Sequence, residues 1–472
     1  MIIRLSLFIL AACLLEAAER PNILFCIADD WGAPHASIYE NDNVVQTPAF
    51  DRIAREGALF HNAYVSSPSC TPCRNSIMTG QWHWRLKDGA NLYGTLSQEV
   101  ETYTRLLKKS GYHTGSWRKS FGPGKLEGKF LEEHPAGKVY PKGFSDFLAN
   151  RPSKDTPFCF WLGASDPHRG YKKGSGEKSG MDLSKIKLFS FFPDNKEVRG
   201  DVADYYFEVQ RFDSDVSKAI ARLEAIGEME NTIIVITGDH GMPFPRCKSN
   251  LYDSGTRVPL AIKWGQKIKK GLQFKDFTSL TDLGPTFLQA ASVKIPVEMT
   301  GKSLLPALTG NGQLRKFILT GKERHVPSQE APSMEGYPSR SYRDHKFLYI
   351  HNYSPSLWPN GTPNWRKATI KNAWYGDTDN GPTKSIIVNL GPGSKFYQWS
   401  FSKRPSEELY KVSNDPDQLN NLAKEMPKIV AKYRELLRSE LKASGDPRHG
   451  GPEFKFAVST YGGGAPRFPG DR

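Results

Sequence analysis

The chain has 472 residues, of which 38% are hydrophobic and 24% charged, and it carries a formal net charge of +14 with a pI near 9.3. This composition excludes a fibrous or disordered protein, and the length allows a large hydrophobic core. The excess of Lys and Arg predicts an anionic partner. Because the basic residues are dispersed and no nucleic-acid-binding motif occurs, we expect an anionic glycan and no nucleic acid.

Residues 1–18 are predicted to be a secretory signal peptide, with an N-terminal helix of the folded domain as the alternative. Arg4 precedes an apolar run too short to span a bilayer, and the small residues Ala17 and Ala18 follow it. The LAAC stretch that ends at Cys13 also fits a bacterial lipoprotein cleavage box, which would make this cysteine a lipid anchor. We therefore expect a secreted or periplasmic protein, soluble or tethered at one end.

Three short apolar runs each end in polar residues. Residues 22–28 (NILFCIA) lead into Asp29 and Asp30, residues 157–164 (PFCFWLGA) into His168, and residues 232–237 (TIIVIT) into Asp239 and His240. Such runs, separated by helical patterns such as residues 205–227, indicate buried parallel strands in a doubly wound α/β sheet. Ligands bind beyond the carboxyl ends of these strands, so we expect the polar side chains to meet there.

The adjacent pairs Asp29-Asp30 and Asp239-His240 exceed what helix capping requires. A single Asp after a strand is commonly a helix N-cap, but several buried carboxylates must be paired or bound to a metal. Three carboxylates with one histidine suit Ca²⁺ or Mg²⁺ better than zinc, which stays an alternative.

The stretch SSPSCTPCRNSIMTG, residues 66–80, contains two cysteines three apart. On spacing alone, Cys70 and Cys73 fit either a redox pair or half of a zinc site. The sequence has neither the thioredoxin-like context that a redox pair needs nor a second Cys/His pair at the spacing of a zinc site. Pro72 suits the first turn of a helix and Arg74 adds a permanent cation, so this helix N-terminus would favour a tetrahedral oxyanion. A thiolate is a poor ligand for a hard cation, whereas an oxygen at position 70 would suit it.

Cys70-Thr71-Pro72-Cys73-Arg74, followed by Thr79-Gly80, resembles the Cys-x-Pro-x-Arg signature of type I sulfatases, whose cysteine is converted to formylglycine. The resemblance extends in order along most of the chain, to residues 20–32, 111–122, 165–171, 237–260 and 406–425. Residues 165–171 and 241–256 are most similar to the heparan N-sulfatase (sulfamidase) branch.

The resemblance implies an alkaline-phosphatase-like α/β fold, with a doubly wound, mostly parallel sheet and a smaller C-terminal α+β domain. It implies formylglycine derived from Cys70 and a formylglycine-generating or sulfatase-maturing enzyme as a partner. The implied ligands of Ca²⁺ (Mg²⁺ being the alternative) are Asp29, Asp30, Asp239, His240 and the modified Cys70. Arg74, Lys119 and Lys248 would neutralise the sulfate, and His168 would protonate the leaving group.

The chain departs from the family pattern at two points. Cys73 stands where many members have serine, which the modification signature tolerates. The other departure affects a base. The usual Gly-Lys-x-His block reads Arg118-Lys119-Ser120-Phe121, so Phe121 stands where the family has a histidine that acts as a base. Since phenylalanine cannot accept a proton, we predict that His83, or else His113, takes this role.

The pattern changes near residue 335, where aromatic strand-like pieces and then a helix at residues 427–444 follow. We expect a catalytic domain at residues 19–334, a C-terminal antiparallel-sheet domain with a helix at 335–445, and a Gly/Pro-rich tail at 446–472.

The expected function is an exported sulfatase that hydrolyses sulfate esters or sulfamates on a sulfated polysaccharide or oligosaccharide. The alternatives are a phosphonate monoester or phosphodiester hydrolase of the same superfamily and an inactive glycan-binding homologue. Retention of Cys70, Arg74 and the four metal positions argues against an inactive protein.

Overall fold

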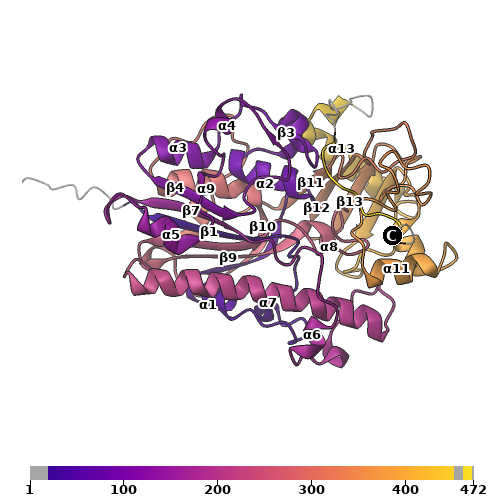
Figure 1. Cartoon of the computed structure of the whole chain (residues 1–472). Coiled ribbons are helices and arrows are strands. Elements are labelled where there is room, and N and C mark those ends of the chain that lie inside the picture. The colour runs from indigo at the N-terminus through magenta and orange to yellow at the C-terminus, as the bar shows by residue number, and fades with distance from the viewer. Residues whose placement is uncertain (1–19, 451–460, 470–472) are drawn as a thin grey trace, which may run out of the picture.

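The computed structural model describes residues 20–450 and 461–469. An eight-stranded sheet runs through the molecule, with helices on both faces (Figure 1). In spatial order its strands are β10 (Leu272–Ser279), β2 (Ala58–Tyr64), β9 (Arg257–Trp264), β8 (Thr232–Gly238), β1 (Asn22–Ala28), β7 (Phe158–Gly163), β4 (His113–Arg118) and β6 (Lys138–Val139). Neighbouring strands are parallel except at β9, which runs antiparallel to β8 and β2. The predicted doubly wound, mostly parallel sheet is confirmed.

The expected signal peptide and Cys13 lie outside the described residues, as does part of the tail predicted at 446–472. Within the residues that are described, none of the helices has both the length and the apolar character needed to cross a membrane.

The three apolar runs identified in the sequence are adjacent strands. β1 lies between β7 and β8 and is parallel to both. The register pairs Ala28 with Gly238, the last residues of β1 and β8. Asp29 and Asp239 therefore emerge level with each other at the same edge of the sheet.

Each face of the sheet is covered by its own set of helices. In β1, Leu24, Cys26 and Ala28 belong to one hydrophobic cluster, and Ile23, Phe25 and Ile27 to another. α1 (Pro48–Glu56), α5 (Phe144–Ala149) and α7 (Lys196–Ala225) contribute to the first cluster. α2 (Cys70–Thr79), α3 (Tyr103–Lys109) and α9 (Leu283–Ala290) contribute to the second. Burial on both faces explains why the strand sequence is continuously apolar.

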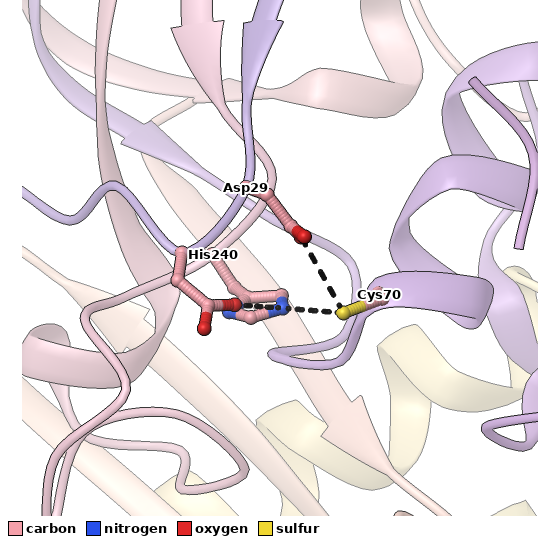
Figure 2. A group of neighbouring side chains, drawn as sticks. Asp29, Cys70 and His240 are labelled. Carbon is pink, nitrogen blue, oxygen red and sulfur yellow. Dashed lines mark hydrogen bonds and ion pairs between the residues drawn. The ribbon is translucent and has the colours of Figure 1, made fainter. Parts of the chain in front are cut away.

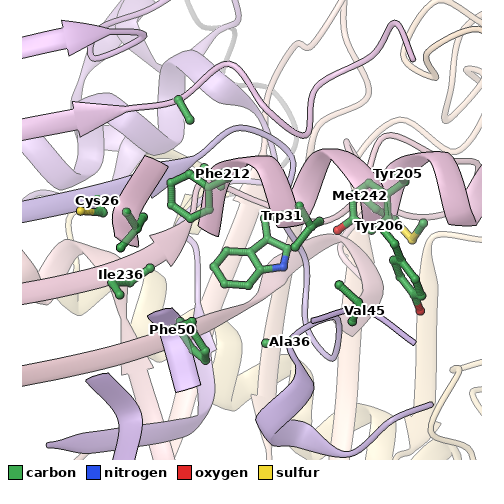
Figure 3. Packing of buried hydrophobic residues seen from close by; sticks show 14 of the residues in the cluster. Cys26, Trp31, Ala36, Val45, Phe50, Tyr205, Tyr206, Phe212, Ile236 and Met242 are labelled. Carbon is green, nitrogen blue, oxygen red and sulfur yellow. The ribbon is translucent and has the colours of Figure 1, made fainter. Parts of the chain in front are cut away.

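Trp31 anchors the turn that follows β1 in the first of these clusters (Figure 3). Its ring makes edge contacts with Phe50 of α1 and Phe212 of α7, at centroid distances of 5.2 and 5.6 Å. Its indole N–H donates to the carbonyl of His35 over 2.7 Å. Because this large side chain is fixed, the preceding Asp29 and Asp30 are held at the sheet edge.

A second, four-stranded antiparallel sheet lies beside the first (Figure 1). It contains β11 (Phe317–Lys322), β12 (Ser339–Asp344), β13 (Phe347–Asn352) and β14 (Glu407–Lys411), and α13 (Pro427–Ala443) packs on it. The predicted smaller α+β region is confirmed. Its sheet begins at Phe317, before the boundary expected at residue 335, because β11 pairs along its whole length with β12.

The remaining elements are short connections around the two sheets. They are β3 (Thr95–Leu96), β5 (Lys125–Leu126), α4 (Lys129–Glu132), α6 (Ser175–Lys178), α8 (Asp253–Thr256), α10 (Leu305–Leu308), α11 (Pro382–Asn389) and α12 (Lys395–Phe401).

The contact between α7 and the start of α1 predicts a pH-dependent stability. The Asp213 carboxylate accepts hydrogen bonds from the backbone N–H groups of Ala49 and Phe50, both at 2.9 Å. Burial nevertheless raises the pKa of Asp213 from 3.8 to about 6. The native state then holds more protons than the unfolded state between these values, so the free energy of unfolding falls as the pH rises through this window.

Asp213→Asn should remove this pH-dependent loss of unfolding free energy. The loss amounts to at most about 3 kcal/mol for a pKa that rises from 3.8 to about 6. Urea unfolding of both proteins from pH 4 to pH 7 should show the variant gaining stability relative to the parent as the pH rises. Glu197→Gln, at an exposed position of the same helix, is the control. Parallel profiles for Asp213→Asn and the parent would contradict the assignment.

Candidate active site

A cleft of about 400 Å³ lies beyond the carboxyl ends of the central strands of the large sheet. Four of the side chains predicted from sequence line it, namely Cys70, Lys119, His168 and Lys248. Other lining residues come from the C-terminal third of the chain, among them His325, Asp379 and Tyr461. The carboxyl edge of the large sheet thus forms the floor, and later segments form the outer wall.

Cys70 is the first residue of α2, and its side chain is almost completely buried. Its Sγ lies 3.6 Å from Oδ1 of Asp29 and 3.4 Å from Nε2 of His240, as the dashed lines in Figure 2 show. Nζ of Lys119 lies 3.2 Å from the same sulfur. Position 70 is therefore in contact with both the acidic strand ends and a cation.

Asp29, Asp30, Cys70 and His240 form a cluster suited to a metal ion. Each offers one ligand atom, and these atoms all lie within 4.8 Å of one another. Nδ1 of His240 is 3.1 Å from the Gly241 carbonyl, to which it donates, so Nε2 presents its lone pair to the cluster. Oδ1 of Asp30 is buried and has no hydrogen-bond partner among the described residues. A buried carboxylate oxygen without a hydrogen-bond partner fits the role of a cation ligand. The carboxylate oxygens of this cluster suit Ca²⁺ or Mg²⁺.

Asp239 connects this cluster to Arg74. Its Oδ1 accepts from the backbone N–H of Asp30 over 2.9 Å and lies 3.5 Å from Nε2 of His240. Its Oδ2 accepts from Nε of Arg74 over 2.9 Å. Both oxygens thus have protein partners, and Asp239 lies outside the four-residue cluster.

The carboxylates are countered by three cations, which are Arg74, Lys119 and Lys248. Arg74 has no exposed surface, and its guanidinium also lies 3.6 Å from Asp29. Lys248 places Nζ 2.9 Å from Oδ2 of Asp30 and 3.1 Å from Oδ2 of Asp379. Burial opposes the charged form of Lys248, but these carboxylates raise its pKa well above the usual value.

At Asp29 the neighbouring cations lower the pKa, whereas at Lys248 the neighbouring carboxylates raise it. Burial by itself would raise the pKa of this carboxyl, but Lys119 and other nearby cations hold it well below its usual value. The four carboxylates of Asp29, Asp30, Asp239 and Asp379 exceed the three cations by one charge. A bound divalent ion would therefore make the site positive enough for an anionic substrate.

Comparison with known proteins identifies the family. The sulfatase family model matches residues 21–293, which is more than half of the chain. The chain belongs to the sulfatase family. It is 27% identical over 453 residues to an ulvan-active sulfatase of Formosa agariphila, covering 91% of this chain and 81% of the relative. It is 29% identical over 495 residues to the N-sulphoglucosamine sulphohydrolase of Homo sapiens, covering 92% and 91%.

A solved structure shows the same fold. This chain is similar to a protein whose structure was solved in complex with its substrate D-glucosamine-2-N,6-O-disulfate. The TM-score is 0.62 at 20% identity, and the match covers 92% of this chain and all of the other. The predicted family and the alkaline-phosphatase-like fold are confirmed, and the protein is a sulfatase.

In this sulfatase His168 is oriented toward the cleft. Its Nδ1 donates to the carbonyl of Arg169 over 2.6 Å. Nε2 is consequently directed inward and lies 4.0 Å from Oδ2 of Asp30. This nitrogen is placed to exchange a proton with a bound substrate.

The structure brings neither His83 nor His113 to the cleft, in contrast to their predicted role as proton acceptor. His83 is wholly buried, with Nδ1 at 2.8 Å from Oγ of Ser66, and burial lowers its pKa well below the usual value. His113 begins β4, so it lies at the amino end of the strand that Lys119 follows. Its ring stacks on Phe147 instead.

Sequence analysis does not identify several of the lining residues, among them His325 and Asp379. His325 lies beside the start of α2, with Nδ1 at 2.7 Å from Oγ of Ser69, and burial lowers its pKa to about 3. Asp379 lies in the loop before α11, which Lys384 organises by donating to the carbonyls of Trp374, Tyr375 and Thr378. Neither residue belongs to a recognisable motif, so only the long-range packing of the C-terminal region reveals them.

Asp379→Asn should lower kcat/KM about tenfold, because Lys248 would lose one of its two carboxylate partners and an interaction with a charged group is worth about 1.5–3 kcal/mol. The fold should be retained, since Asp379 is partly exposed. Steady-state kinetics on a sulfate ester checks this, with Asp194→Asn at a surface ion pair as the control. Unchanged kinetics in Asp379→Asn would show that Asp30 alone positions Lys248.

Proposed function

We propose that this sulfatase is exported and removes sulfate from a sulfated oligosaccharide or polysaccharide, using formylglycine at position 70 and Ca²⁺ held at the strand ends. The observation that carries the proposal is the environment of Cys70. Carboxylates, a histidine and a lysine surround its sulfur, which is the setting of a hard oxygen rather than of a thiol.

The unmodified thiol is unsuited to this site. Burial raises the pKa of Cys70, and Lys119 does not offset that effect. The neutral thiol is a weak nucleophile and a weak ligand. Conversion to formylglycine would supply a hydrated aldehyde whose oxygens suit both the nucleophilic role and the metal.

Asp29, Asp30, Asp239 and His240 would hold Ca²⁺ together with the modified residue 70, with Mg²⁺ as the alternative. When bound, the ion would polarise the sulfuryl group and neutralise charge at the nucleophile. The close cluster supports Asp29, Asp30 and His240 most directly. Asp239 supports the set through Nε2 of His240 and the Asp30 backbone.

The cations of the chain would bind the sulfate. Lys119 and Lys248 line the cleft and present ammonium groups on either side of the Asp29-Asp30 pair. Arg74 lies behind them and fixes the carboxylates. Nε2 of His168 would hold the proton that the leaving oxygen or nitrogen takes up, so that the alcohol or amine departs neutral.

A sulfated glycan is the substrate class that the available comparisons support. One relative is ulvan-active, another is an N-sulphoglucosamine sulphohydrolase, and a protein of the same fold binds a disulfated glucosamine. The net charge of +14 suits an anionic polymer.

Export is proposed from the N-terminal sequence, with a lipid anchor at Cys13 as the form it would take in a lipoprotein. The maturation partner would be a formylglycine-generating or sulfatase-maturing enzyme. Because Cys70 is only 3% exposed, that enzyme has to reach it before the chain folds.

Wild-type protein should release sulfate from at least one member of a panel of heparin-derived and ulvan-derived oligosaccharides, measured by ion chromatography. Mass spectrometry of its tryptic peptide should show an aldehyde in place of the thiol at position 70. Cys70→Ala should lower turnover by at least about a hundredfold because it removes the nucleophile. Full activity with only unmodified cysteine at that position would refute the mechanism.

Exhaustive chelation should abolish turnover, and Ca²⁺ should restore it. Isothermal titration should detect Ca²⁺ binding that Asp30→Asn weakens, because that variant removes the negative charge of a carboxylate whose Oδ1 lies 3.3 Å from Nε2 of His240. Circular dichroism should show an unchanged fold. Restoration by zinc alone would contradict the choice of a hard cation.

A further inference from the structure

We propose that a second hollow beside the catalytic cleft is a sugar-binding subsite, which holds the unit adjoining the one that carries the scissile sulfate. This inference rests on the proposed glycan substrate. The hollow has a volume of about 690 Å³, within the range of ligand-binding pockets. It lies between the loop before α11, α11 itself and residues 465–469.

The two hollows share one wall. Asn380, Ala465 and Pro466 line both of them. Two of these three side chains are small and apolar, and Gly464 precedes them on the cleft side. A glycan chain that leaves the cleft past this shared wall would therefore enter the second hollow.

The wall is fixed by backbone hydrogen bonds. The Pro466 carbonyl accepts from the N–H of Trp374 over 2.9 Å, and the N–H of Phe468 donates to the Asn372 carbonyl over 3.0 Å. The ring of Phe468 stacks on Trp365 at 4.8 Å between centroids. A wall built in advance spares the ordering cost of binding, which favours a specific subsite.

Asn380 belongs to this framework. Its Nδ2 donates to the Arg467 carbonyl over 2.7 Å, and its Oδ1 accepts from Nζ of Lys384 over 2.9 Å. The side chain is thus committed within the protein and positions the wall. Recognition of a sugar must come from other residues of the hollow.

Three polar side chains of the hollow, Asn372, Ser385 and Arg467, are available to a ligand. Within residues 20–450 and 461–469, none of their side-chain polar groups has a hydrogen-bond or ion-pair partner. Arg467 is exposed and Ser385 half-buried, and no carboxylate is among the described residues that line the hollow. A hydroxyl and a free guanidinium suit a sugar that carries hydroxyls and a sulfate or carboxylate. The guanidinium can donate two parallel hydrogen bonds to two oxygens of such an anionic group.

The test is a binding measurement on the Cys70→Ala protein, which cannot turn substrate over. Isothermal titration compares a heparin tetrasaccharide and an ulvan tetrasaccharide, each with the sulfated monosaccharide obtained from it. At least one tetrasaccharide should bind about tenfold more tightly than its monosaccharide. Arg467→Ala and Ser385→Trp, which fills the hollow, should each abolish most of this gain and leave monosaccharide binding unchanged. Arg222→Ala, on the exposed side of α7, removes an equal charge elsewhere and should retain the gain.

Equal affinity for tetrasaccharide and monosaccharide, or a gain that survives Arg467→Ala, would overturn the subsite. Should Ser385→Trp fail to fold, the exposed Arg467 still decides the question. Failure of the proposed function appears separately, as an absence of sulfate release by the wild-type enzyme from every oligosaccharide of the panel.

Discussion

The pairing of Arg74 with Asp239 and Asp29 is the interaction on which the site depends. A guanidinium with no exposed surface is tolerable only if its charge is matched at hydrogen-bond distance. The match ties the first helical turn after Cys70 to the ends of two central strands. The position of Cys70 relative to the acidic cluster is thereby fixed by a single buried network, and removing either partner would leave an uncompensated charge.

Much of the floor of the site could be predicted from sequence because it is built from local signals. An apolar run buried on both faces has a recognisable pattern, and the residue that ends it must lie at a sheet edge. Cys70 and Arg74 lie within one turn of the same helix, so their proximity follows from spacing alone. The fold class was predictable for the same reason, since the strands that dominate it are short, continuous and apolar.

The outer wall was not predictable, because it depends on packing between segments hundreds of residues apart. Asp379 reaches the cleft through a loop shaped by a buried lysine, and His325 through a hydroxyl at the start of α2. His83 is close to Cys70 in sequence, yet the chain turns away after the helix and buries it. β11 begins at Phe317, ahead of the domain boundary predicted at residue 335, and it belongs to the second sheet through its pairing with β12 further along the chain.

The wall contributed by Gly464, Ala465 and Pro466 has a consequence for the order of events during synthesis. These residues follow Cys70 by about 395 residues, so they are synthesised later. At 5–20 residues per second, the interval between them is roughly 20–80 s. Throughout that interval this wall is missing, and the stretch around Cys70 is not enclosed on that side. The separation of the wall from position 70 in the sequence therefore sets how long this position stays accessible during synthesis, and the length of that window is a property of the chain itself.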